Sequence, residues 1–149
     1  MPSDINRRFH LAVRPTNLPG DAHFRIETAP IPKPGTGEVL VRVLIAAWSP
    51  WQGQRLKDFE NYTAPFEIGE LIDCDVLGQV VESKTGERQP GDLVTGRLGW
   101  QEYAIAKPEN LLPATRDFGE TLWLTALSSP GLTAYCAMEM FGRPMPGQT

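Results

Sequence analysis

Short stretches of alternating apolar and polar residues dominate the first hundred positions of the chain. In the clearest of them, residues 38–49, Val39, Val41, Val43 and Ile45 fall on one face of an extended backbone. Other runs of strand-forming residues occupy positions 9–15, 24–29, 75–83, 92–97 and 100–107. Glycine and proline turns separate these runs at close spacing, which predicts a mainly β fold, a small and partly open β-barrel.

Three local features refine this prediction. Turn-forming residues at 16–21 separate the first two runs, so we expect 9–15 and 24–29 to form a hairpin-like pair. Residues 50–60 begin with a proline and have mixed periodicity, which fits either a short helical turn or an irregular loop. Gly78 interrupts an otherwise apolar run, which indicates a bulge or a close backbone approach.

The pattern changes to a helical one after residue 115. Asp117 is followed three positions later by Glu120 and then by apolar residues, which predicts a helix start at Asp117. A second helix is expected to have Ser129 as its cap and Pro130 at its first position, and to end at Gly142. Residues 117–142 are therefore predicted to be terminal helices.

Length, composition and charge exclude several classes of protein. A chain of 149 residues is long enough for one domain of ordinary size. Its net charge of −4 argues against a nucleic-acid partner, and no apolar run is long enough to predict a membrane span or a secretory leader. Cys74 and Cys136 are too few for a disulfide-stapled scaffold, which favours a reducing compartment and a cytoplasmic location.

Several motifs, in order along the chain, resemble those of the medium-chain dehydrogenase/reductase superfamily. Residues 128–135 (SSPGLTAY) resemble G-M-P-G-L-T-A-Y, and 99–103 (GWQEY) are similar to G-W-Q-x-Y. Residues 90–94 (PGDLV) resemble the G-D-x-V turn, 49–56 (SPWQGQRL) look like a diverged D-P-Y-M-R-G-R-M, and 62–70 (YTAPFEIGE) are similar to Y-x-P-P-F-x-x-G-E. The resemblance is to the zinc-free branch of NADPH-dependent alkenal, prostaglandin and curcumin reductases, the leukotriene B4 12-hydroxydehydrogenase-like enzymes.

This resemblance implies a fold and a reaction. Residues 1–149 would be the GroES-like, substrate-side domain of such a reductase, with 117–142 leading toward a Rossmann domain that would begin near the end of this chain. The reaction would be hydride transfer from NADPH to an enone, an alkenal or a quinone. We expect the chain by itself to be inactive and to bind little or no NADPH, because the phosphate-binding turn belongs to the Rossmann domain.

The same resemblance assigns roles to individual residues. Ser49, Trp51, Tyr62 and Ser129 would line the substrate cleft, and Pro130 and Thr133 would lie at the nicotinamide. Ser49 replaces an acid and Trp51 replaces a tyrosine of the family pattern, which leaves the substrate range open. No residue of the chain is expected to be catalytic, and no metal is expected, because His10 and His23 have no nearby cysteine.

Structural explanations compete with most of these roles. Trp51, Trp100 and Tyr103 fit core packing, Tyr62 fits a surface loop, and the segment 130–135 fits an ordinary helix start. A zeta-crystallin-like quinone oxidoreductase domain and a non-catalytic GroES-like binding module are alternative functions. An exposed helix face makes a homodimer a further expectation.

Overall fold

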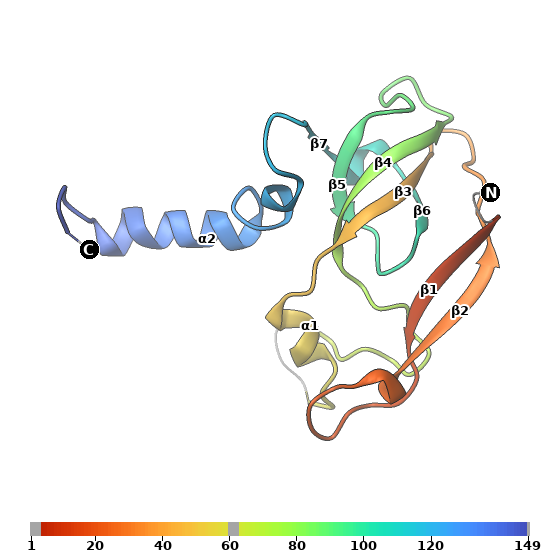
Figure 1. The fold of residues 1–149 in the computed structure, drawn as a ribbon, viewed down its shortest axis with the longest axis horizontal. Coiled ribbons are helices and arrows are strands. Elements are labelled where there is room, and N and C mark those ends of the chain that lie inside the picture. Colours follow the sequence, from red (N-terminus) through yellow and green to blue (C-terminus); the bar gives the residue numbers. More distant parts are fainter. Residues whose placement is uncertain (1–3, 60–62, 149) are drawn as a thin grey trace. The chain divides into compact units, whose positions relative to one another are not determined.

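The computed structural model describes residues 4–59 and 63–148 and divides the chain into two compact units, Met1–Ala114 and Thr115–Thr149. The first unit begins with an antiparallel hairpin of β1 (Ile5–Leu11) and β2 (Phe24–Pro30) (Figure 1). The pairing was predicted, but β1 begins and ends four residues before the predicted run 9–15. A 3-10 turn, η1 (Asp21–His23), leads into β2. Phe9 lies opposite Ile26 and Leu11 opposite Phe24, so apolar side chains from both strands share one face.

Five antiparallel strands form the second sheet, in the order β6-β3-β4-β5-β7. They are β3 (Val39–Ala46), β4 (Asp75–Ser83), β5 (Leu93–Arg97), β6 (Tyr103–Ala106) and β7 (Leu112–Ala114), with a 3-10 turn η2 (Pro108–Asn110) before the last. The alternation predicted for β3 places Val39 and Val41 in a core cluster. The other members of the cluster come from β4, β5, β6 and the residue after η2: Val80, Val94, Ala106 and Leu111.

Gly78 allows β3 and β4 to approach closely. A Cβ atom at this position would lie 2.4 Å from Val41 Cγ1 and 2.9 Å from the carbonyl oxygen of Arg42. The strand register shifts beside it, between Val43 and Ile45. The close approach expected from the sequence is therefore confirmed.

The hairpin is attached to the five-stranded sheet by polar contacts and isolated bridges. The bridges pair Arg8 with Gln101 and His10 with Leu71. Asn6 is buried, and its side-chain oxygen accepts hydrogen bonds from the backbone N–H groups of Glu102 and Tyr103 at 3.1 and 2.9 Å. The mainly β character is confirmed, whereas closure of the strands into a barrel stays a prediction.

The segment after β3 forms a short helix, α1 (Pro50–Arg55), rather than an irregular loop. Pro50 is well suited to its first turn because that turn needs no N–H donor. A second core cluster lies under this helix and the hairpin, and consists of Leu11, Leu56, Phe66 and Ile72.

The second unit differs from the prediction of two terminal helices. The first of them is only a 3-10 turn, η3 (Glu120–Leu124), because the backbone of Thr125 (φ −126°, ψ −91°) leaves the helical region. The helix α2 (Ser129–Ala137) follows and continues as a wider π-type turn, η4 (Met138–Gly142), which ends at the predicted residue. Its cap is Ser128 rather than Ser129, and the left-handed residue after it is Arg143 (φ 43°). No helix among the described residues is long and apolar enough to cross a membrane.

Candidate functional site

The entry to α1 holds two of the residues predicted to contact substrate, Ser49 and Trp51. The backbone N–H of Ser49 donates to Gln52 Oε1 at 2.7 Å, and Gln52 Nε2 donates to the carbonyl oxygen of Ala47 at 3.1 Å. Gln52 is buried, so these bonds are shielded from water. Its side chain therefore fixes the turn that presents Ser49 and Trp51.

Trp51 packs against the second core cluster and also contacts charged groups. It is partly buried, and the guanidinium carbon of Arg97 lies 4.2 Å from the ring centroid. Arg97 Nε in turn donates to Asp73 Oδ2 at 2.6 Å. The structure thus gives Trp51 both a packing contact and a partly exposed ring surface that is bordered by a cation.

A buried arginine connects this region to the segment after residue 62. Arg55 has a side chain only 12% exposed, and it pairs with Glu70 at 3.1 Å and with Asp73 at 3.5 Å. Its guanidinium also lies 3.8 Å from the centroid of the Phe66 ring. Arg55, Arg97, Glu70 and Asp73 form an ionic network in which each charge has an opposite partner.

Cys74 follows Asp73 of this network in the chain. The thiol is buried, and burial, together with the negative charges of Asp73 and Asp75, raises its pKa to about 12. A thiol of that acidity is a poor proton donor near neutral pH.

The remaining predicted residues lie in the second unit, at the start of α2. Ser129 and Pro130 occupy its first turn, and Thr133 Oγ1 donates to the carbonyl oxygen of Ser129 at 2.8 Å. A Cβ atom on Gly131 would lie 1.9 Å from the carbonyl oxygen of Ala126, so only glycine fits against the preceding turn. The structure therefore brings Ser129, Pro130 and Thr133 together, as it does Ser49 and Trp51 in the first unit. Tyr62 lies outside the described residues.

The residues weighed as metal ligands have structural partners. His10 is buried in β1, and its Nδ1 lies 2.8 Å from the carbonyl oxygen of Gly69. His23 Nδ1 lies 3.0 Å from the backbone N–H nitrogen of Gly20. Among residues 4–59 and 63–148, no three His, Cys, Asp or Glu side chains are grouped so as to hold a metal ion.

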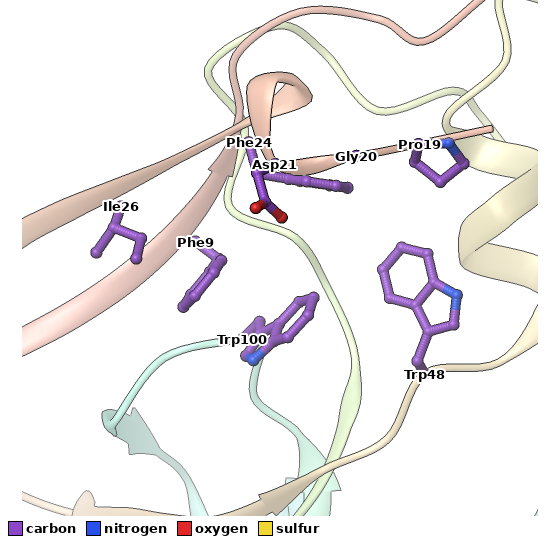
Figure 2. Close-up of a pocket in the computed structure, with 8 residues that line it drawn as sticks. All are labelled: Phe9, Pro19, Gly20, Asp21, Phe24, Ile26, Trp48 and Trp100. Atoms are coloured by element: carbon purple, nitrogen blue, oxygen red, sulfur yellow. The ribbon is translucent and has the colours of Figure 1, made fainter. Parts of the chain in front are cut away.

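Sequence reasoning missed an aromatic hollow of about 540 Å³ in the first unit. Figure 2 shows Phe9, Phe24, Trp48 and Trp100 around it, with the carboxylate of Asp21 directed inward. Pro19, Gly20 and Ile26 complete the lining. The alternation in β1 and β2 was a usable signal, since it places Phe9 and Ile26 on one face, but Trp48 and Trp100 come from distant segments.

A second hollow, of about 810 Å³, lies between residues 14–19 and α1. Arg14 forms one wall, and its guanidinium donates to the carbonyl oxygens of Leu56 at 3.2 Å and Phe66 at 2.7 Å. Pro50 and Gly53 of α1 line the opposite side. The guanidinium is already engaged with the backbone, so its main effect here is to fix the loop against the helix.

A match to a family model shows the class of protein to which the first unit belongs. A family model described as the N-terminal domain of oxidoreductase matches residues 7–114, which is nearly the whole first unit. The chain belongs to this family. The resemblance to the medium-chain dehydrogenase/reductase superfamily that the motifs indicated is therefore confirmed.

Individual relatives are close to this chain over most of its length. It is 35% identical over 145 residues to the NADPH-dependent curcumin reductase of Escherichia coli strain K12. This alignment covers 97% of this chain and 42% of the relative. It is 32% identical over 118 residues to the NADP(+)-dependent 2-alkenal reductase of Nicotiana tabacum, which covers 77% of this chain and 34% of that enzyme.

A solved structure agrees with these sequence matches. The crystal structure of CurA from Vibrio vulnificus superimposes with a TM-score of 0.86 at 30% identity, covering 96% of this chain and 42% of CurA. A second CurA structure contains NADPH. The chain thus spans less than half the length of these relatives.

Proposed function

We propose that this chain is the substrate-side domain of an NADPH-dependent reductase that reduces the C=C bond of α,β-unsaturated carbonyl compounds. The observation that supports it most is the 35% identity to a curcumin reductase over 97% of the chain. Curcumin and 2-alkenals, named in two relatives, share a carbon–carbon double bond conjugated to a carbonyl group. The substrate proposed here is defined by that shared group.

The start of α2 fits a nicotinamide neighbour in its hydrogen-bonding capacity. Thr133 Oγ1 uses its proton on the carbonyl oxygen of Ser129, so the hydroxyl oxygen keeps lone pairs that can accept from an amide N–H. The carboxamide of a nicotinamide carries such a group. When bound, NADPH would supply the hydride that adds to the β-carbon, while a proton completes the reduction at the α-carbon.

The residues of α1 would act by positioning. Trp51 is partly exposed, and its contacts with the core and with Arg97 restrict its movement, so the exposed part of the ring would meet a conjugated substrate in a fixed orientation. Ser49 would contribute a polar group at the entry to the same helix. Among the described side chains we assign none as the proton donor, and the elevated pKa of Cys74 argues against that thiol.

The test is an assay of the complete open reading frame that encodes this chain, expressed to its natural stop codon. We expect NADPH consumption with a 2-alkenal or with curcumin, and mass spectrometry should identify the product with a saturated C–C bond. Consumption with quinones alone would favour the quinone oxidoreductase, and no consumption with any of these acceptors would favour a binding module. The 149-residue chain alone serves as the control that we expect to be inactive.

Cytoplasmic location and homodimer formation belong to the same proposal. Two unpaired cysteines, one of them exposed, suit a reducing compartment. The exposed apolar residues of α2 and η4 are a plausible surface for self-association. Neither a nucleic acid nor a membrane is proposed as a partner.

A further inference from the structure

The aromatic hollow has walls made of ring faces and edges at several orientations. Phe9 stacks on Trp100 with 4.7 Å between ring centroids, and Trp48 lies 5.8 Å from Trp100 at an interplanar angle of 50°. Phe24 meets Trp48 edge-on, at 6.4 Å and 90° (Figure 2). Rings so arranged surround a small volume on more than one side.

The side chains that line the hollow are not all buried by packing. Trp48 is 46% exposed and Ile26 is 54% exposed, although both are large apolar side chains. They border a hollow of about 540 Å³, a size typical of small-molecule sites. Phe9, Phe24 and Trp100 are partly exposed as well. A concave group of such residues is more informative than a single exposed one, because a ligand would bury several of them together.

One charged group completes the lining. The carboxylate of Asp21, in the turn η1, points into the hollow toward Trp100 (Figure 2). In the described part of the chain no lysine, arginine or histidine forms an ion pair with it. The nearby cation of β2, Arg25, is instead bonded to Glu27. The hollow therefore combines ring faces of negative potential with an uncompensated negative charge.

This combination selects the charge and the shape of a ligand. Aromatic faces attract cations, and a ligand with methyl groups around its charge also gains from burying apolar surface. An anion would be repelled by Asp21, and a bare metal ion would find a single carboxylate and no other charged ligand in the lining. A neutral enone would gain nothing from the carboxylate.

We propose that this hollow binds the methylated ammonium group of a small organic cation, with the aromatic faces around the methyl groups and Asp21 as the counter-charge. The hollow contains none of the residues predicted to contact substrate or NADPH. The inference therefore stands independently of the proposed reductase activity. It assigns Trp48 and Trp100 a binding role that alternation along the strands did not suggest.

The experiment compares choline with its neutral isostere, 3,3-dimethylbutan-1-ol, on the ¹⁵N-labelled 149-residue chain. The indole N–H signals of Trp48 and Trp100 report binding directly. We expect saturable shifts with choline and roughly tenfold weaker binding of the neutral alcohol. Equal affinity for the two compounds, or no shift with choline, would overturn the proposal.

Two variants and one control separate the contribution of the Asp21 carboxylate from that of the aromatic rings. Asp21→Asn should weaken choline binding and leave binding of the neutral alcohol unchanged, whereas Glu109→Gln, an exposed charge change elsewhere in the first unit, should affect neither. Trp48→Ala should abolish the shift at Trp100 while the melting temperature stays near that of the parent. If Asp21→Asn binds choline as the parent does, the carboxylate is not the counter-charge and the proposal is wrong.

Discussion

The guanidinium carbon of Arg97 lies 4.2 Å from the centroid of the Trp51 ring, and the same arginine is bonded to Asp73. This stack joins the end of β5 to the first turn of α1. Core residues contact the same ring. The ring is therefore held at the place where the family resemblance puts the substrate. Packing and substrate positioning are therefore compatible roles for Trp51, and they differ in what a truncation would do.

Trp51→Ala should lower the free energy of unfolding by about 1–3 kcal/mol, less than the roughly 3–5 kcal/mol typical of a fully buried tryptophan. The reason is that the ring is only partly buried. Urea unfolding of the 149-residue chain measures this. Trp51→Phe is the control, since it keeps an aromatic surface and should lose less stability.

The positioning role of Trp51 is tested by measuring kcat/KM of the reductase expressed from the complete reading frame. If Trp51 orients the substrate, Trp51→Ala should lower kcat/KM about tenfold to a hundredfold for a bulky enone, equivalent to roughly 1.4–2.7 kcal/mol. A small enone should be affected less. An equal loss for both substrates, together with a large fall in melting temperature, would leave Trp51 with packing alone.

Gly78→Ala should destabilise the chain by about 1–3 kcal/mol, because the added methyl group would overlap the side chain of Val41 and the backbone of Arg42. The matched control is Gly86→Ala, where a Cβ atom would meet nothing within 4 Å. That change should be neutral or slightly stabilising. Thermal unfolding of both variants measures the difference, and equal melting temperatures would contradict the close approach of β3 and β4 at Gly78.

Strands with strict alternation were predictable from the sequence, whereas elements that depend on distant pairing were not. β4 has the predicted bounds and β3 lies within its predicted range. β7 was not predicted, because a three-residue strand containing Pro113 has no local signal and forms only by pairing with β5. The helix predicted to begin at Asp117 was wrong: the segment forms only the 3-10 turn η3, because the backbone of Thr125 leaves the helical region.

The candidate site likewise contains residues that a local pattern groups and residues that only distant pairing brings together. Ser49 and Trp51 are separated only by Pro50 in the chain, so a local motif was enough to group them. The aromatic hollow needs the β1–β2 register to place Phe9 near Phe24, and the Gly99 turn (φ 76°) before Trp100. The stack of Phe9 on Trp100 joins residues about ninety positions apart, which no local pattern encodes.

The two cysteines should differ sharply in reactivity. Burial raises the pKa of Cys74 to about 12, so at pH 8 its thiol is protonated as well as inaccessible, whereas Cys136 is exposed. A disulfide reagent should therefore modify one thiol quickly in the native chain and two in urea. Mass spectrometry of the native product should place the label on Cys136. Rapid modification of both thiols without urea would contradict the buried position of Cys74.

The ion pair of Arg7 with Glu102 should make stability depend on pH. Arg7 Nε donates to Glu102 Oε1 at 3.0 Å and the Arg7 backbone N–H donates to Oε2 at 2.9 Å. These hydrogen bonds and the positive charge of Arg7 lower the pKa of Glu102. The stabilisation is then fully present above the unfolded-state pKa of about 4.3 and is lost as the pH falls through the lower folded-state pKa.

Glu102→Gln should therefore be less stable than the parent at pH 7 by about 0.5–1 kcal/mol, a modest value because both side chains are partly exposed. At about pH 3 the difference should shrink, since the parent carboxylate is being protonated. Urea unfolding of both proteins at the two pH values measures it. A difference that grows on acidification would contradict the assignment.

The helix α2 and the turn η4 carry several large apolar side chains that are exposed. Leu132, Tyr135, Met138 and Phe141 are 63%, 64%, 52% and 81% exposed. Because a large group of exposed apolar residues normally marks an interaction surface, we expect the 149-residue chain to self-associate through these residues. The double substitution Leu132→Glu with Phe141→Glu should shift it toward monomer in sedimentation velocity and reduce binding of a hydrophobic dye. Leu18→Glu, at a loop position that is 91% exposed, is the control and should leave the association unchanged. Monomeric behaviour of the parent at every concentration, with no dye binding, would show that the exposed apolar residues of α2 and η4 do not form a self-association surface.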